Sequence, residues 1–187
     1  TVKMGKIKGK GQVWLETVIY ILIGLVLIGL VLSFIIPKIN ERKDRIIVEQ
    51  ALISLNLFDS KIKEVIETGQ YNKRVIEFSM QRGSLYIDSE MNKIIFVLRD
   101  LTKPYSQPGI NIPLGRVVLR TEQDRRTNSV NLTLQYGLGT DLTFDGGQNT
   151  KKFNPSTIPY KFAIENQGIK DINAQGDKAY GIDITQL

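Results

Sequence analysis

The longest apolar stretch of the chain runs from Thr17 to Ile36, twenty residues without Asp, Glu, Lys or Arg. At about 1.5 Å of rise per residue, a helix of this length spans roughly 30 Å, the thickness of the hydrocarbon core of a bilayer. A helix in a soluble core is rarely apolar all round over such a length. The run therefore predicts a transmembrane helix, and the rest of the fold must be compatible with a membrane anchor at this place.

Four residues in or next to this run affect the shape and packing of the helix. Gly24 and Gly29 are five residues apart and so do not form a GxxxG pair; we interpret them as points of close helix approach or of local unwinding. Ser33 is expected to bond to a carbonyl of its own helix. Pro37 lacks an N–H and is expected to bend the helix or interrupt its hydrogen bonds.

The net charge of +6 is concentrated ahead of the apolar run. When the lysines of the first eleven residues are removed, 21 basic and 19 acidic residues remain. A nucleic-acid-binding protein spreads its cations along a groove or face, whereas a short basic segment before an apolar helix is typical of a cytoplasmic flank. We therefore expect no nucleic-acid partner. The four lysines are Lys3, Lys6, Lys8 and Lys10.

The chain contains neither Cys nor His. Disulfides and thiol chemistry are excluded, as are the commonest general base near neutral pH and the commonest metal ligand. We predict no catalytic residue, no cofactor and no metal site, and we do not expect an enzyme.

The residues around the apolar run argue against an ordinary secretory signal, which is cleaved after its apolar region at small residues. Here the run is followed by Pro37-Lys38-Ile39-Asn40-Glu41, while Glu16 and a Lys-rich segment ending in Gly11 precede it. The segment Lys10-Gly11-Gln12-Val13-Trp14-Leu15-Glu16 resembles the class III signal peptide of archaeal type IV prepilins. The resemblance covers about residues 6–40, and Trp14 departs from it because many members have a small residue there.

The resemblance implies that a dedicated prepilin peptidase cuts between Gly11 and Gln12. Glu16 is then the fifth residue of the mature chain, where many members carry Glu. The resemblance also implies that Glu16 meets the amine of a neighbouring subunit's first residue and sets the register between subunits. A carboxylate near hydrocarbon costs several kcal/mol unless it is paired, which gives this contact a physical reason. Two alternatives stay open: Glu16 reaches water without a partner, or Gln12 cyclises to pyroglutamate and loses its charge.

Beyond Pro37, apolar residues recur near helical spacing until Gly69, which supplies a C-terminal stop. This predicts one helix from about residue 13 to 68, the first half in the membrane or a filament core and the second half supporting a head domain. Asp59-Ser60 is expected to mark a local break. The recurring residues are Ile39, Ile46, Ile53, Ile62, Val65 and Ile66.

From Tyr71 onward the pattern changes to the alternation of short strands separated by turn residues. We expect the prolines of this region to lie between strands. The predicted fold class is α+β, a long N-terminal transmembrane helix followed by an antiparallel β-sandwich-like head. The predicted strands are Arg74–Met80, Ser84–Asp88, Lys93–Leu98, Arg116–Thr121, Val130–Tyr136, Asp141–Phe144, Tyr160–Asn166 and Tyr180–Ile184.

The resulting domain organisation has three parts. Residues 1–11 are a class III signal peptide, residues 12–69 a transmembrane or filament-core helix with its stem, and residues 70–187 an extracellular β-domain.

Three short segments of the head resemble ligand loops only in part. Gly137-Leu138-Gly139-Thr140-Asp141-Leu142 lacks the third Gly and the following helix of a nucleotide loop, so a turn is favoured. Asp88-Ser89-Glu90-Met91-Asn92 offers oxygens to Ca²⁺ but lacks the spacing of an EF-hand, so a hairpin loop is favoured. Asp145-Gly146-Gly147 is interpreted as a turn.

Two further features concern the surface of the head. Asn131-Leu132-Thr133 is an N-glycosylation sequon, and Asn131 is an acceptor if it faces solvent in an exported domain. Five tyrosines of the head form either a sugar- or surface-binding patch or, as we favour for aromatic residues that alternate in strands, part of the core. They are Tyr86, Tyr105, Tyr136, Tyr160 and Tyr180.

The resemblance and the architecture together predict a subunit of an archaeal type IV pilus-like filament for adhesion or surface attachment. Its expected partners are copies of itself in a helical homopolymer, other pilins, prepilin peptidase, a membrane platform and an assembly ATPase. It is expected in the cell membrane before assembly and at the cell surface afterwards. The alternative is a membrane-anchored binding or stator component, a minor pilin or archaellum-associated protein, whose β-domain grips the cell envelope or a ligand.

Overall fold

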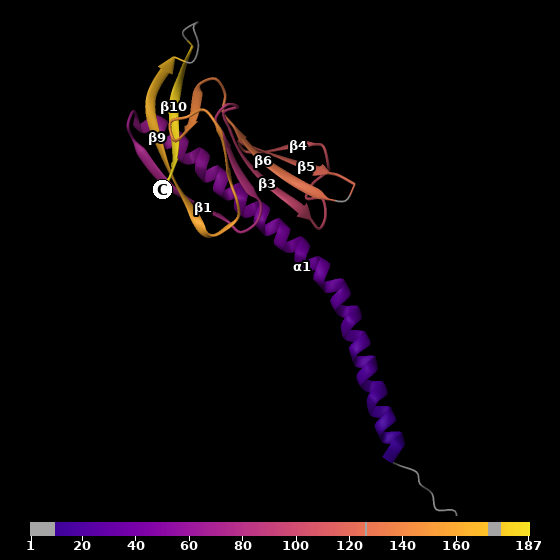
Figure 1. Cartoon of the computed structure of the whole chain (residues 1–187). Coiled ribbons are helices and arrows are strands. Elements are labelled where there is room, and N and C mark those ends of the chain that lie inside the picture. The colour runs from indigo at the N-terminus through magenta and orange to yellow at the C-terminus, as the bar shows by residue number, and fades with distance from the viewer. Residues whose placement is uncertain (1–9, 126, 172–176) are drawn as a thin grey trace, which may run out of the picture. The chain divides into compact units, whose positions relative to one another are not determined.

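The computed structural model describes residues 10–125, 127–171 and 177–187, the first four of them by their backbone only. In this part of the chain a helix, α1 (Lys10–Thr68), is followed by ten strands (Figure 1). The chain divides into two compact units, Thr1–Arg42 and Lys43–Leu187, which are described separately. The strands are β1 (Lys73–Met80), β2 (Ser84–Asp88), β3 (Lys93–Leu101), β4 (Asn111–Leu114), β5 (Val117–Gln123), β6 (Asn128–Gln135), β7 (Thr140–Phe144), β8 (Thr150–Phe153), β9 (Ser156–Asp171) and β10 (Lys178–Gln186).

The C-terminal part of α1 buries one face in the second unit. Its fully buried apolar residues recur every three or four positions, the spacing that places side chains on one side of a helix. Burying a large apolar side chain of this kind stabilises a fold by about 1.5–3 kcal/mol. This part of α1 is therefore a core element of the head. The residues are Val48, Ala51, Leu55, Phe58, Ile62 and Val65, each at most 3% exposed.

The end of α1 is fixed by hydrogen bonds to its last carbonyls, which have no partner inside a helix. Gly69 takes a φ of 104°, a left-handed conformation that favours glycine. The Asn72 amide donates to the Thr68 carbonyl (3.1 Å), and the buried Asn166 amide of β9 donates to the Val65 carbonyl (2.9 Å). The predicted stop at Gly69 is confirmed. The predicted break at Asp59-Ser60 is wrong, because the helix continues through both residues.

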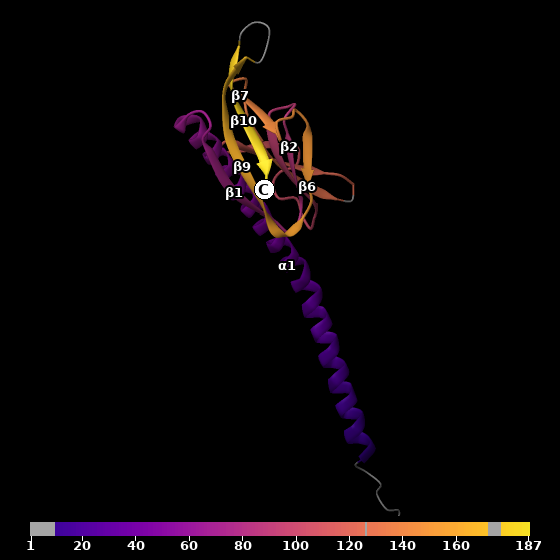
Figure 2. The same cartoon turned by 60° about the vertical axis from the view of Figure 1, so that its left-hand side comes forward.

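Four strands form one sheet in the order β1-β9-β10-β7. The pairs β1–β9 and β9–β10 are antiparallel, whereas β10 and β7 run parallel. Figure 2 shows β9, β10 and β7 side by side in this order. The parallel pair is the one departure from an entirely antiparallel head among the described strands.

Six strands form the second sheet in the order β4-β5-β6-β3-β2-β8, and all its pairs are antiparallel. Its central strands alternate between fully buried and half-buried side chains, as expected when one face lies on the core. Ile94, Phe96 and Leu98 of β3 face inward, while Ile95 and Val97 face outward.

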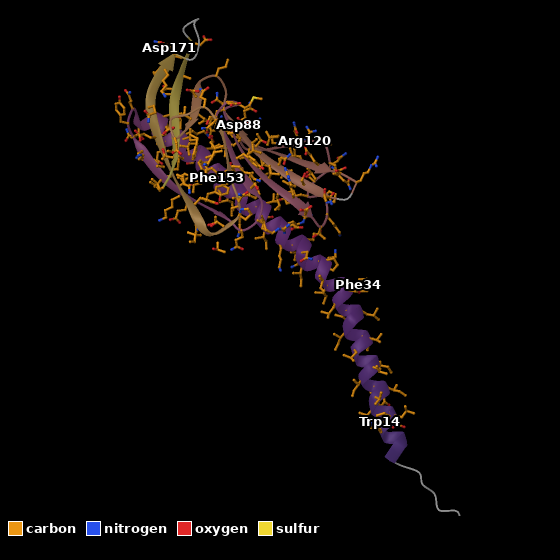
Figure 3. The ribbon with its side chains drawn as sticks, in the orientation of Figure 1. Trp14, Phe34, Asp88, Arg120, Phe153 and Asp171 are labelled. Carbon is orange, nitrogen blue, oxygen red and sulfur yellow. The ribbon has the colours of Figure 1, made fainter. Side chains whose placement is uncertain are left out.

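The inner faces of both sheets and the buried face of α1 share one hydrophobic core. Aromatic rings connect the three layers: Phe58 of α1 lies 6.1 Å from Phe78 of β1 and 5.5 Å from Phe162 of β9, measured between ring centroids. Phe153 of β8 lies 5.0 Å from Phe162, and its side chain is labelled in Figure 3. The predicted α+β class with a sandwich-like head is confirmed.

Two of the prolines expected between strands lie inside them. Pro113 sits in β4, which is an edge strand beside β5 in the described sheet, so its missing N–H removes no bond from a central ladder. Pro159 lies in β9 where the register with β1 shifts between Phe78 and Met80. Both follow the rule that proline in a sheet is confined to edges and irregularities.

Candidate functional site

The N-terminal part of α1 exposes its apolar side chains on all sides. Within the first unit, the exposed fraction of its large exposed apolar residues ranges from 44% at Ile19 to 74% at Phe34. Trp14 and Phe34 both project from the helix in Figure 3. The helix is long and apolar enough to cross a membrane, and none of its most apolar window is buried. Gly24 and Gly29 have no other heavy atoms within 4 Å of an added Cβ, so their surfaces are open to a neighbouring helix.

Two details of this segment concern its hydrogen bonds. The Ser33 hydroxyl donates to the Leu30 carbonyl (2.7 Å), which confirms the expected bond to its own helix. α1 continues through Pro37, so its extent is not interrupted there. Because proline has no N–H, the Ser33 carbonyl lacks the usual donor four residues later.

The residues expected to direct processing and assembly lie at the start of the same helix. Gly11 and Gln12 belong to α1, and their side chains lie outside the described set. Glu16 immediately precedes the apolar run, and its side chain is exposed. Cleavage between Gly11 and Gln12 and the pairing of Glu16 with a neighbouring amine stay predictions.

A buried carboxylate attaches α1 to the six-stranded sheet. Asp44 is 4% exposed; it accepts bonds from Arg82 Nη1 (2.6 Å) and from the backbone N–H of Thr102 (2.8 Å). Arg82 precedes β2, and Thr102 directly follows β3. One acid therefore holds the helix and two neighbouring strand ends together.

A second buried carboxylate, Asp59, lies fifteen residues further along α1 at 6% exposure. It accepts a bond from the Tyr136 hydroxyl (3.2 Å) and pairs with Lys63 Nζ (2.6 Å) and Arg116 Nε (3.5 Å). The Arg116 guanidinium also lies 5.0 Å from the Tyr136 ring centroid. Burial raises the pKa of Tyr136, and the nearby Asp59 charge and hydrogen bond raise it further, so the hydroxyl stays a donor.

The sequence analysis did not identify Asp44 and Asp59 as buried residues that attach the helix, although a signal for both was present. Asp44 precedes Val48 by four residues, and Asp59 adjoins Phe58, so the helical period places both acids near the buried face. An acid on a buried face needs a hydrogen-bonded partner. These acids therefore serve to attach the helix.

Asn131 lies in β6, a central strand of the six-stranded sheet. It pairs with Val97 of β3 and Arg120 of β5 and is half-buried on the outward face. Glycosylation at this position stays a prediction.

The three partial ligand loops have the structures that the sequence favoured. Residues 137–139 form a turn before β7, with the Thr140 N–H donating to the Gly137 carbonyl (3.1 Å). Residues 89–92 form the hairpin loop between β2 and β3. Asp145 and Gly146 form a tight turn with positive φ angles of 50° and 72°. Among the described residues, no three acids lie close enough together to hold a metal ion.

The five tyrosines do not form one surface patch. Tyr136 is buried, and Tyr105 and Tyr160 pack against the core, as the favoured interpretation predicts. Tyr86 is half-buried on the outward face of β2, and Tyr180 is 39% exposed.

Comparison with known proteins gives no relative: no family model, no curated protein and no solved structure matches the chain.

Proposed function

We propose that the chain is a structural subunit of an archaeal type IV pilus-like surface filament that assembles through its apolar N-terminal helix. The observation that carries the proposal is the exposed apolar surface between Trp14 and Ile36. Soluble monomers rarely expose contiguous apolar patches larger than a few hundred Å². The apolar surface of such a helix is covered by lipid, by other helices, or first by lipid and later by other helices. A pilin meets this need by leaving the membrane to enter a bundle of identical helices.

The residues before the apolar run support this proposal over a permanent anchor. The proposed peptidase removes the lysines by cutting between Gly11 and Gln12, and the new amine then pairs with Glu16 of a neighbouring subunit. This pairing compensates a carboxylate that hydrocarbon disfavours and fixes the axial register. The proposed partners are other pilins, a membrane platform and an assembly ATPase, and the head faces outward for surface attachment.

Mass spectrometry of the chain purified from its native membrane or from surface fibres tests the processing step. We expect a chain that begins at Gln12. Gly11→Val should leave the leader in place and keep the chain in the membrane fraction, while Gly9→Val, the same change two residues earlier, should be processed normally. A wild-type chain that keeps its N-terminal lysines in surface fibres would refute the proposed cleavage. A chain that keeps them in the membrane would favour the alternative of a membrane-anchored binding or stator component.

Electron microscopy of sheared surface material tests the role of Glu16. Glu16→Gln removes the charge and is expected to abolish or strongly reduce filaments. Glu67→Gln makes the same change at an exposed position late in the same helix and should leave filaments intact. Normal filaments from processed Glu16→Gln chains would contradict the register function.

A further inference from the structure

An open cavity of about 280 Å³ lies on the outward side of the six-stranded sheet, over β2, β3 and the segment from β8 to β9. Drug-sized ligands occupy pockets of about 300–1,000 Å³, so this volume suits one small ring. Its lining combines cations, hydroxyls and apolar surface. The residues that line it include Arg82, Ser84, Tyr86, Arg99, Lys152 and Pro155.

Three basic side chains and one acidic one, Asp100, line the cavity, so its lining carries a net positive charge. Arg82 is engaged by Asp44 at 2.6 Å. Arg99 and Lys152 are exposed, and neither has an ion-pair partner in the described part of the chain. Lys152 Nζ lies 5.8 Å from the Tyr86 ring centroid. Two cations from different strands are thus available to an anion beside an aromatic ring.

A bulge in β3 directs one of these cations. The register with β6 shifts between Leu98 and Leu101, so Arg99 and Asp100 face a single residue of β6. Asp100 takes a φ of 58°, a left-handed conformation that is uncommon for residues other than glycine. Bulges of this kind re-aim side chains and are frequent beside binding sites.

Arg82 holds the bulge in place. Its Nη2 lies 3.5 Å from the carbonyl oxygens of both Arg99 and Asp100, while its Nη1 donates to the buried Asp44. The position of Arg99 is therefore supported from the core of the head. A site preorganised in this way loses less entropy when a ligand binds.

We propose that this cavity binds a carboxylate-bearing sugar, a residue of the uronic acid type within an acidic saccharide. Arg99 and Lys152 pair with the carboxylate, because guanidinium and ammonium groups form charge-assisted hydrogen bonds with it. The Tyr86 ring and Pro155 provide the apolar surface for the sugar ring, and the Ser84 hydroxyl bonds to a ring hydroxyl. The proposal does not depend on filament assembly.

The test uses the full chain in a polyoxyethylene detergent, which carries neither sugar nor phosphate. Glucuronic acid, glucose and inorganic phosphate are titrated separately by calorimetry, with saturation-transfer NMR to detect weak binding. We expect saturable binding of glucuronic acid, weaker binding of glucose, and weakening of the glucuronic acid complex by salt. No saturable binding of glucuronic acid, or equal binding of glucose, would overturn the proposal. Phosphate binding as tightly as glucuronic acid would also overturn it, because the site would then recognise charge alone.

Variants identify the two cations. Lys152→Ala and Arg99→Ala should each weaken binding of glucuronic acid by about two- to fivefold, the effect of one exposed ion pair, and the double variant should weaken it further. Lys151→Ala removes the same charge from the neighbouring residue of β8, outside the cavity, and should bind like the wild type. Both cations are exposed, so circular dichroism should show intact folds. Unchanged affinity in both single variants, or equal loss in Lys151→Ala, would contradict the proposed site.

Discussion

The two parts of α1 have the same backbone conformation and opposite surroundings. Between Trp14 and Ile36 the large apolar side chains are largely exposed, up to 74% at Phe34. From Lys43 to Thr68 the apolar side chains on one face are fully buried, including Phe58 at 0%. Helix formation is thus common to both segments, and the distribution of polar residues around the axis separates them. The second segment is amphipathic and contributes one face to the core of the head, whereas the first has no polar face and exposes apolar side chains on all sides.

We therefore expect the second segment to affect the stability of the head and the first segment to affect membrane insertion or assembly. Substitutions on the buried face of the second segment should act on the unfolding of the head in a single chain. Substitutions in the first segment should leave that unfolding unchanged and act on membrane insertion or association.

The two phenylalanines of α1 form a matched pair. Phe58→Ala should lower the free energy of unfolding of the head by about 3–5 kcal/mol, because it removes a ring that packs on Phe78 and Phe162. Phe34→Ala makes the same change at a 74% exposed position and should alter it by less than about 0.5 kcal/mol. Denaturant unfolding of the full chain in detergent, followed by near-ultraviolet circular dichroism, measures both. Similar losses in the two variants would refute this difference between the segments.

Asp59 tests whether the second segment is attached by a specific polar contact. Asp59→Ala should destabilise the head by about 1–3 kcal/mol, because the buried Tyr136 hydroxyl loses its acceptor. Tyr136→Phe removes the hydroxyl, and a double-mutant cycle between the two positions should give a favourable coupling free energy of about 0.5 kcal/mol or more. Additive effects would show that the two side chains act independently.

Asp59 illustrates a feature that could not be predicted from the sequence. The sequence around Asp59-Ser60 predicted a break, and Asp and Ser are both weaker helix formers than Ala or Leu. The partners that keep the helix continuous, Arg116 and Tyr136, come from residues more than fifty positions later. Pairing over such a distance is set by tertiary structure, which local pattern does not contain.

The same distinction applies to the strands and to the cavity. Central strands such as β3 alternate clearly between buried and half-buried residues and were predicted. The edge strands β4 and β8 were missed because they lack this alternation and form by pairing with the strand beside them. β8 has three exposed residues in a row and one buried, and β4 contains Pro113. The apolar run from Thr17 to Ile36 was evident from the sequence alone, because it contains no charged residue. The bulge at Arg99 was not, because a bulge depends on the register between β3 and β6.

Glycine substitutions in the two segments should also differ in their effect on the stability of the head, by a smaller amount. Gly69 ends the second segment with a φ of 104° and no atom near an added Cβ, so Gly69→Ala costs only backbone strain, about 1 kcal/mol. Gly24→Ala meets no atom within 4 Å and should leave the unfolding of the head unchanged. Thermal midpoints of the two variants in detergent measure the difference. A lower midpoint for Gly24→Ala would indicate that the first segment contributes to the stability of the head.

A weaker effect, a pH dependence of stability, is expected from Glu64 of α1, which forms an ion pair with Arg74 of β1. Hydrogen bonds from Lys61 and Arg74, both at 2.6 Å, lower the pKa of Glu64 from its usual 4.5. A lowered pKa means that the folded chain binds the proton less readily than the unfolded chain. The stabilising contribution is therefore fully present above about pH 4.5 and is lost as the pH falls through the folded pKa.

Glu64→Gln should accordingly lose stability at pH 7 and approach the wild type as the solution becomes more acidic. The side chain is 39% exposed, so salt should reduce the difference. Glu67→Gln controls for the lost charge three residues later, where the described residues provide no ion pair. Denaturant midpoints measured from pH 3 to pH 7 at low and high salt give the comparison. A difference between wild type and Glu64→Gln that stays constant across this range would show that the contact with Arg74 acts through packing, and that charge plays no part in joining α1 to β1.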